Sequence, residues 1–235
     1  MRRRAVTALA LLSLGLVGVA GCGGDSASET TTTSLAPATA PATPPPPTAS
    51  LPDTAPGAPL GDESLPSPTA VPGVERGDVQ TLRTAGELVD LLYQSGDPTK
   101  PGALARLEDA GFAGAVLRDQ PGTDPSVGIA LLRSYAIRLR DEAAARDEVT
   151  AAVDEVRRSA GGASSDIDVS EIPGAQALRV QVDQGGQSGT VVFVTFPAGP
   201  VVYGIQGVSA SGLDTSEEEI IGAARALAKR AGATP

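Results

Sequence analysis

Proline and the aromatic residues divide this chain of 235 residues into two unlike parts. Residues 23–73 hold 12 of the 20 prolines, include the runs Thr30–Thr33 and Pro44–Pro47, and contain no aromatic residue. Such a segment cannot bury enough apolar surface to offset the conformational entropy lost on ordering, so we expect an extended, disordered linker. All six aromatic residues lie beyond residue 80, and a hydrophobic core must therefore be built there.

Residues 74–235 suffice for one ordinary domain. Capping residues and apolar spacing predict four helices in it, at about residues 85–96, 101–111, 142–160 and 217–230. Alternation and β-propensity predict five strands, at residues 112–118, 127–139, 176–183, 190–196 and 201–208. Arg133 interrupts the apolar side of the second strand, which indicates a bulge or a strand end.

The last three strands are joined by connectors too short for crossovers, so they are expected to form an antiparallel meander. Together the elements predict an α+β fold class, with an antiparallel β-sheet and helices packed mainly on one face. A signal segment and the linker would precede this single domain.

The first residues of the chain are typical of a secretory signal. Arg2–Arg4 precede an apolar run, Ala5–Ala20, which is shorter than the roughly 20 residues that a membrane-spanning helix needs. The run ends at Val19, Ala20 and Gly21, followed by Cys22, which is the only cysteine. A plain signal peptide with an incidental cysteine and an uncleaved anchor are the alternatives.

Val19-Ala20-Gly21-Cys22 resembles the lipobox of bacterial lipoproteins. The resemblance implies that residues 1–21 are cleaved as a lipoprotein signal peptide and that Cys22 carries a diacylglyceryl group. Residues 22–73 would then be an acylated cysteine with its tether, and residues 74–235 a domain held outside the membrane. The expected location is the cell membrane, lipid-anchored on the extracytoplasmic side.

The composition resembles that of actinobacterial, mycobacterium-type surface lipoproteins, because Arg outnumbers Lys 16 to 2 and Ala, Gly and Pro are abundant. Ala110-Gly111-Phe112 and Ile172-Pro173-Gly174-Ala175 resemble segments of uncharacterised secreted actinobacterial α+β domains, and the element order is similar to a PsbP-like sandwich. Mixed Thr and Pro residues resemble O-glycosylated stalks, with a bare linker as the alternative. The candidate glycosylation sites are Thr30, Thr31, Thr32, Thr33, Thr39, Thr43 and Thr48.

The residue inventory excludes several kinds of chemistry. Without His there is no histidine-based triad or imidazole metal site, and a single Cys forms no internal disulfide. A net charge of -10 argues against nucleic acid as a partner. Asp166, Asp168 and Ser170 imitate the start of a calcium loop, but Glu171 stands where that loop requires glycine. We therefore predict no catalytic residue, metal site or cofactor, and no enzyme.

The sequence thus predicts a membrane-anchored cell-envelope lipoprotein that presents a non-enzymatic binding or structural domain. Its partners would be the membrane, through the diacylglyceryl anchor, and an unknown protein or envelope ligand. The alternative is a lipid or glycolipid carrier with an apolar cavity in the 74–235 domain. Such a cavity would lie beneath Val192, Val194 and Phe196, or beside Tyr135 and Tyr203.

Overall fold

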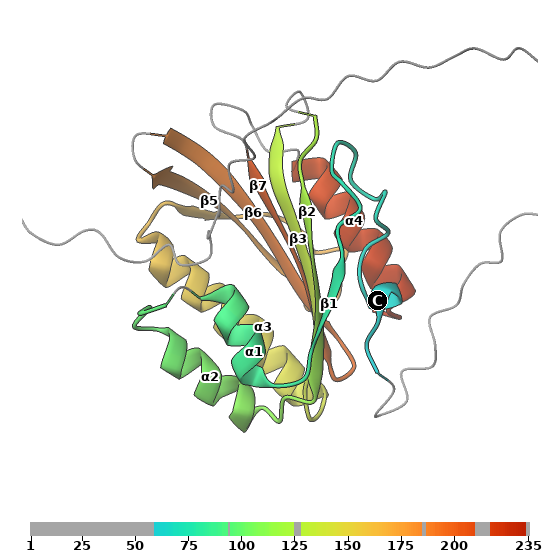
Figure 1. Ribbon diagram of the computed structural model, residues 1–235, viewed down its shortest axis with the longest axis vertical. Coiled ribbons are helices and arrows are strands. Elements are labelled where there is room, and N and C mark those ends of the chain that lie inside the picture. Colours follow the sequence, from blue (N-terminus) through green and yellow to red (C-terminus); the bar gives the residue numbers. More distant parts are fainter. Residues whose placement is uncertain (1–58, 94, 125–127, 185–186, 210–216, 234–235) are drawn as a thin grey trace, which may run out of the picture.

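The computed structural model describes residues 59–93, 95–124, 128–184, 187–209 and 217–233 (Figure 1). Within these ranges the chain forms seven strands, four α-helices and one short 3-10 helix, Asp62–Ser64. The strands are β1 (Val79–Leu82), β2 (Gly114–Pro121), β3 (Ile129–Arg138), β4 (Ser164–Asp166), β5 (Gln176–Gln184), β6 (Gln187–Ala198) and β7 (Val201–Ser209). The helices are α1 (Ala85–Leu92), α2 (Lys100–Asp109), α3 (Glu142–Ala160) and α4 (Glu217–Arg230).

The seven strands form one antiparallel sheet in the order β1-β2-β3-β7-β6-β5-β4. The predicted meander is confirmed as β5, β6 and β7. Strand β7 pairs with β3 in the middle of the sheet, so the chain segments before and after α3 meet there. The central strands therefore combine residues that are about 70 positions apart in the sequence.

Helices α1, α2 and α3 pack on one face of the sheet, which we call the helical face, and α4 packs on the other (Figure 1). Each face has its own buried apolar cluster. The predicted α+β fold, with helices mainly on one face of an antiparallel sheet, is confirmed. The local signals also hold, because Thr84 and Glu87 form a capping box at α1 and Asp141 caps α3.

The folded part begins earlier than the predicted boundary at residue 74. Residues 60–75, which we call the strap, lie on the α4 side of the sheet, and Leu65 and Val71 are fully buried there. Their proline content predicted linker, but these apolar side chains complete the core under α4. Strands β1 and β4 were also missed, because each is short and is specified mainly by the strand beside it.

Polar side chains from β2 and α4 fix the strap. The Arg118 guanidinium pairs with the Asp62 carboxylate at 2.6 Å and donates to the main-chain carbonyl of Pro66. The Gln120 amide donates to the carbonyls of Pro68 at 3.1 Å and Glu75 at 2.8 Å. The strap is thus held mainly through its backbone, which a search for apolar periodicity does not detect.

Candidate functional site

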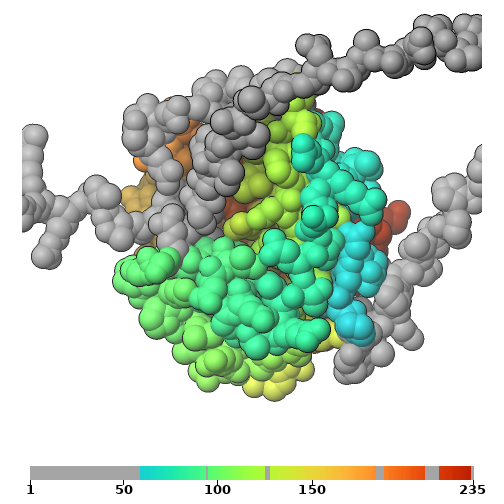
Figure 2. All heavy atoms as spheres, in the orientation of Figure 1, coloured from blue at the N-terminus to red at the C-terminus, as the bar shows by residue number. Residues whose placement is uncertain are grey.

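The three helices of the helical face cover the sheet only in part. Beyond them the ends of β2, β3, β5, β6 and β7 continue (Figure 1), and Figure 2 shows atoms of β3 in view above the helices. On this part of the sheet, polar side chains occupy positions that alternation assigns to the interior.

A line of polar side chains crosses the helical face there. The strand registers pair Asp119 of β2 with Arg133 of β3, and Arg133 with Gln206 of β7. Gln206 is in turn paired with Phe193 of β6. Side chains of directly paired residues lie side by side on one face of a sheet. The register alone therefore creates a continuous polar row, which we call the Arg133 row: Asp119, Arg133 and Gln206.

Arg133 is fixed in this row by a two-point ion pair. Its Nε and Nη2 atoms donate to the two carboxylate oxygens of Asp119, both at 2.7 Å. This geometry orients the planar guanidinium and leaves its Nη1 edge directed elsewhere. Within the described part of the chain, Nη1 has no hydrogen-bond partner.

Gln206 is the direct register partner of Arg133 on β7. The residue is only 4% exposed, yet its carboxamide makes no hydrogen bond to any described residue. Neither polar atom of this side chain is among the fully buried atoms that lack a partner in the described part of the chain. The carboxamide therefore keeps some contact with solvent, and this makes the Arg133 row the candidate site of the helical face.

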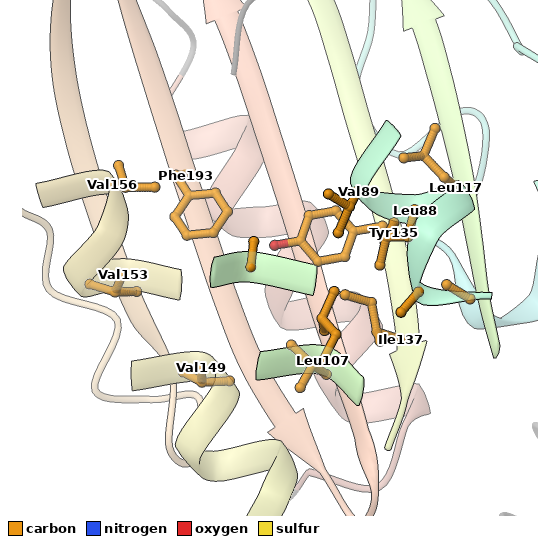
Figure 3. Close-up of a cluster of buried hydrophobic side chains, with 14 of the residues drawn as sticks. Leu88, Val89, Leu107, Leu117, Tyr135, Ile137, Val149, Val153, Val156 and Phe193 are labelled. Carbon is orange, nitrogen blue, oxygen red and sulfur yellow. The ribbon is translucent and has the colours of Figure 1, made fainter. Parts of the chain in front are cut away.

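Aromatic and apolar side chains form the surroundings of the row. Tyr135 follows Arg133 on the same face of β3, and Figure 3 shows its ring among side chains of α1 and α2, with Phe193 beside Val156 of α3. Burial, and then the charge of Glu148, raise the pKa of Tyr135 far above its usual range. The phenol is thus a neutral group at physiological pH.

A second polar cluster joins the three helices. The Arg106 guanidinium of α2 meets two carboxylates of α3, with its Nε 2.9 Å from Glu148 and its Nη1 3.0 Å from Glu155. The hydroxyl of Tyr93, which ends α1, donates to Glu155 at 2.8 Å. Burial raises the pKa of Glu148 although Arg106 opposes the shift. Because its members satisfy one another, this cluster serves helix packing rather than ligand binding.

The calcium-like residues are engaged locally. Asp166 pairs with Arg157 at 2.8 Å, and the Asp168 carboxylate accepts from the backbone N–H of Ser170 at 3.0 Å. Across the described ranges, acidic residues, Cys and His form no group of three or more that could hold a metal ion. Among the helices of those ranges, none has the length and hydropathy to cross a membrane.

The sites predicted from the sequence lie outside the described residues. This applies to Cys22, to the lipobox residues Val19, Ala20 and Gly21, and to the candidate glycosylation sites from Thr30 to Thr48. The structure does not place them, and their assignments stay predictions.

Sequence reasoning missed the Arg133 row. The interpretation of Arg133 as a bulge or strand end is wrong, because the residue lies inside β3 and the irregularity of the β3–β7 ladder falls between Ile129 and Leu131. The usable signal was three interruptions of the apolar alternation, one in each of three strands. The three interruptions are adjacent only in the observed strand order, which the local sequence patterns did not predict.

Comparison with known proteins adds a distant structural match. No family model and no curated protein matches the chain. Among solved structures, the extracellular domain of PknH from Mycobacterium tuberculosis matches with a TM-score of 0.35 and 9% sequence identity. The match covers 66% of this chain and 78% of that one.

Proposed function

We propose that this protein is a cell-envelope lipoprotein, acylated at Cys22, that holds a non-enzymatic binding domain outside the membrane. Its linker gives the domain reach, and the Arg133 row is its recognition site. The observation that carries the binding role is the polar row itself, in which Asp119 orients the Arg133 guanidinium and the adjacent strand brings Gln206 into register with it. The membrane role depends on the lipobox resemblance.

Two features support binding rather than catalysis. Asp119 neutralises Arg133, and the phenol of Tyr135, the next side chain on the same face of β3, has a pKa far above physiological pH. Such a set can orient a ligand by hydrogen bonds, but it supplies neither an activated nucleophile nor a base with a pKa near 7.

The binding role is tested on the full mature chain by NMR. Fractions of an actinobacterial envelope, separated into lipid, polysaccharide and protein, are added while the Arg133 Nε–H and Gln206 side-chain amide signals are followed. We expect one fraction to shift both signals saturably. No response to any fraction would refute a binding role for the row.

The anchor is tested by detergent partition of the expressed protein. Wild type should enter the detergent phase, and Cys22→Ser should remain in the aqueous phase because the thioether cannot form. Gly21→Ala keeps a small residue before the cysteine and serves as the control. If Cys22→Ser partitions as wild type does, lipidation at this residue is wrong.

A lipid carrier is the second candidate, favoured by an apolar row next to the Arg133 row. Leu131, Val208 and Val191 are in register there, and could line an acyl chain. The position suggested by Phe196 and Tyr203 is less suitable, because the two rings stack at 5.2 Å within the α4 cluster. Native mass spectrometry distinguishes the candidates: a co-purified lipid favours the carrier, and a clean apo mass favours the binding module.

A further inference from the structure

Three fully buried polar atoms lie together on the α4 side of the sheet. Among the described residues, Nε of Arg118, Oε1 of Gln120 and Oγ of Ser134 are buried without a hydrogen-bond partner. Arg118 and Ser134 are direct register partners, and Gln120 follows Arg118 on the same face of β2. We call these three residues the buried polar patch.

The strap covers this patch. Helix α4 packs over β6 and β7, whereas the patch lies on β2 and β3. The other polar atoms of Arg118 and Gln120 bond to the strap, and Leu65 and Val71 of the strap share an apolar cluster with Val116 of β2. Closing of the strap therefore removes the patch from water.

This closing has an unfavourable part. Each polar atom that is buried without a partner lowers the equilibrium constant for burial about fivefold or more. The Asp62 carboxylate that pairs with Arg118 is itself about half exposed, which weakens its compensation of the buried charge. Burial lowers the pKa of Arg118 against the effect of Asp62, and the charges of Arg76 and Arg230 lower it further. The closed strap is thus opposed by both desolvation and repulsion.

The hydrogen-bond pattern allows the strap to leave without unpairing a strand. Its main-chain bonds are made within the strap or to the turn after β2, where Glu75 N–H donates to the carbonyl of Pro121 and Thr123 N–H donates to that of Gly73, both at 2.8 Å. The ladders that join β2 to β1 and β3 include no strap residue.

Gly77 provides the point about which the strap can turn. It has a positive φ of 65°, and a Cβ there would overlap the main-chain oxygen of Asp119 in β2. The chain is therefore held close against β2 just before β1 begins. Movement of the strap ends at this contact, and the sheet beyond it keeps its pairing.

We propose that the strap opens and closes as a unit about Gly77 while the sheet remains folded. Opening exposes the buried polar patch to water, and this offsets part of the apolar contact that is lost at Leu65 and Val71. The inference goes beyond the proposed function, since it concerns the other face of the sheet. Because the chain before residue 59 continues from the strap, a force on that part of the chain acts first on the strap.

The first experiment is native-state hydrogen exchange of the full mature chain, followed by NMR at several urea concentrations below the unfolding transition. The probes are the N–H groups of Leu65, Ala70 and Glu75, which are bonded in the closed strap, and those of β3, which is paired on both sides. The strap amides should be at least about tenfold less protected than those of β3, with a weaker dependence on urea. Equal protection and equal urea dependence would mean that the strap opens only by global unfolding, and would overturn the proposal.

The second experiment tests the patch through the sign of one substitution. Ser134→Ala removes a buried hydroxyl that has no partner, so it should raise the protection of the strap amides about fivefold. Ser209→Ala is the matched control, because the Ser209 hydroxyl is also buried but accepts from the N–H of Thr190 at 2.6 Å. This control should lower the urea midpoint of the whole domain. Strap protection that is unchanged or lower in Ser134→Ala, with circular dichroism as in wild type, would overturn the role of the patch.

Discussion

Tyr135 lies against Gly204 across the β3–β7 pair, in the space that a side chain at position 204 would need. The two residues are directly paired, and a Cβ at position 204 would overlap the Cζ and hydroxyl of the phenol. The glycine thus allows a buried tyrosine to lie flat on the sheet, two residues from Arg133 and on the same face. The position of the Tyr135 ring beside the Arg133 row therefore depends on the absence of a side chain at position 204.

Gly204→Ala should therefore destabilise the domain by about 1–3 kcal/mol, the usual cost of overpacking a core. The Tyr135 ring is buried between the sheet and the helices and has little room to move. Urea denaturation followed by circular dichroism measures the change.

Gly222→Ala is the matched control, because Gly222 lies in α4 with no heavy atom within 4 Å of the added Cβ. This variant should gain up to about 1 kcal/mol from helix propensity. Equal effects of the two substitutions would show that the contact between Tyr135 and Gly204 is not tight.

Asp62→Asn should release the strap. Arg118 is completely buried and Asp62 provides its carboxylate, so removing that charge leaves a buried guanidinium poorly compensated. Because Asp62 itself is about half exposed, we expect a loss of about 1–3 kcal/mol rather than more. Limited proteolysis should cut within residues 60–75 sooner than in wild type.

Asp90→Asn breaks an ion pair of the same length, with Lys100 at 2.6 Å, but at the surface. It should cost at most about 1 kcal/mol and leave the strap resistant to protease. If the strap of Asp62→Asn is as resistant to protease as that of wild type, the ion pair between Arg118 and Asp62 does not hold it in place.

The sequence predicted the elements whose signals are local. The Thr84–Glu87 box, the Asp141 cap and the alternation in β5 to β7 each depend on residues within one element, and all are found in the structure. The fold class followed from the order of these elements.

Features that depend on distant residues were not predicted. Leu65 and Val71 are core residues because they pack in the cluster under α4, and the strap that carries them is held by Arg118, Gln120 and Arg230. The Arg133 row exists only because β7 returns to pair with β3. The proline content of the strap predicted a linker, and the break in alternation at Arg133 predicted an irregularity. Neither local pattern contains information about the strands and helices that lie beside these residues in the fold.

All three tyrosines should resist ionisation in the native state. Burial is the main cause that raises the pKa of Tyr93, Tyr135 and Tyr203, and the charge of Glu155 adds to it at Tyr93. Native protein should form tyrosinate only at a higher pH than the protein in concentrated urea, where the midpoint should be about 10. Since the native state holds these protons more tightly, their stabilisation is complete below about pH 10 and is lost as pH rises through the native pKa values. One third of the total absorbance appearing near pH 10 would show that one ring is accessible.

Glu148→Gln tests the helix-joining cluster through pH. Burial, the largest cause, raises the pKa of Glu148 against the opposing effect of Arg106, while the charge of Glu155 adds to the rise. The native state therefore binds this proton more tightly than the unfolded chain does. The stabilisation from that proton is complete below the unfolded pKa, about 4.3, and is lost as pH rises through the native value.

Gln at position 148 imitates the protonated carboxyl at every pH. The stability of wild type relative to Glu148→Gln should therefore decrease as pH rises from about 4, and become constant above the native pKa. The absolute difference also contains the lost ion pair with Arg106, so the prediction concerns the slope. Urea denaturation at a series of pH values measures it, with Glu142→Gln, at an exposed carboxyl of the same helix, as the baseline. A relative stability that rises over this range would mean that Arg106 outweighs burial and that the carboxylate of Glu148 is favoured in the fold.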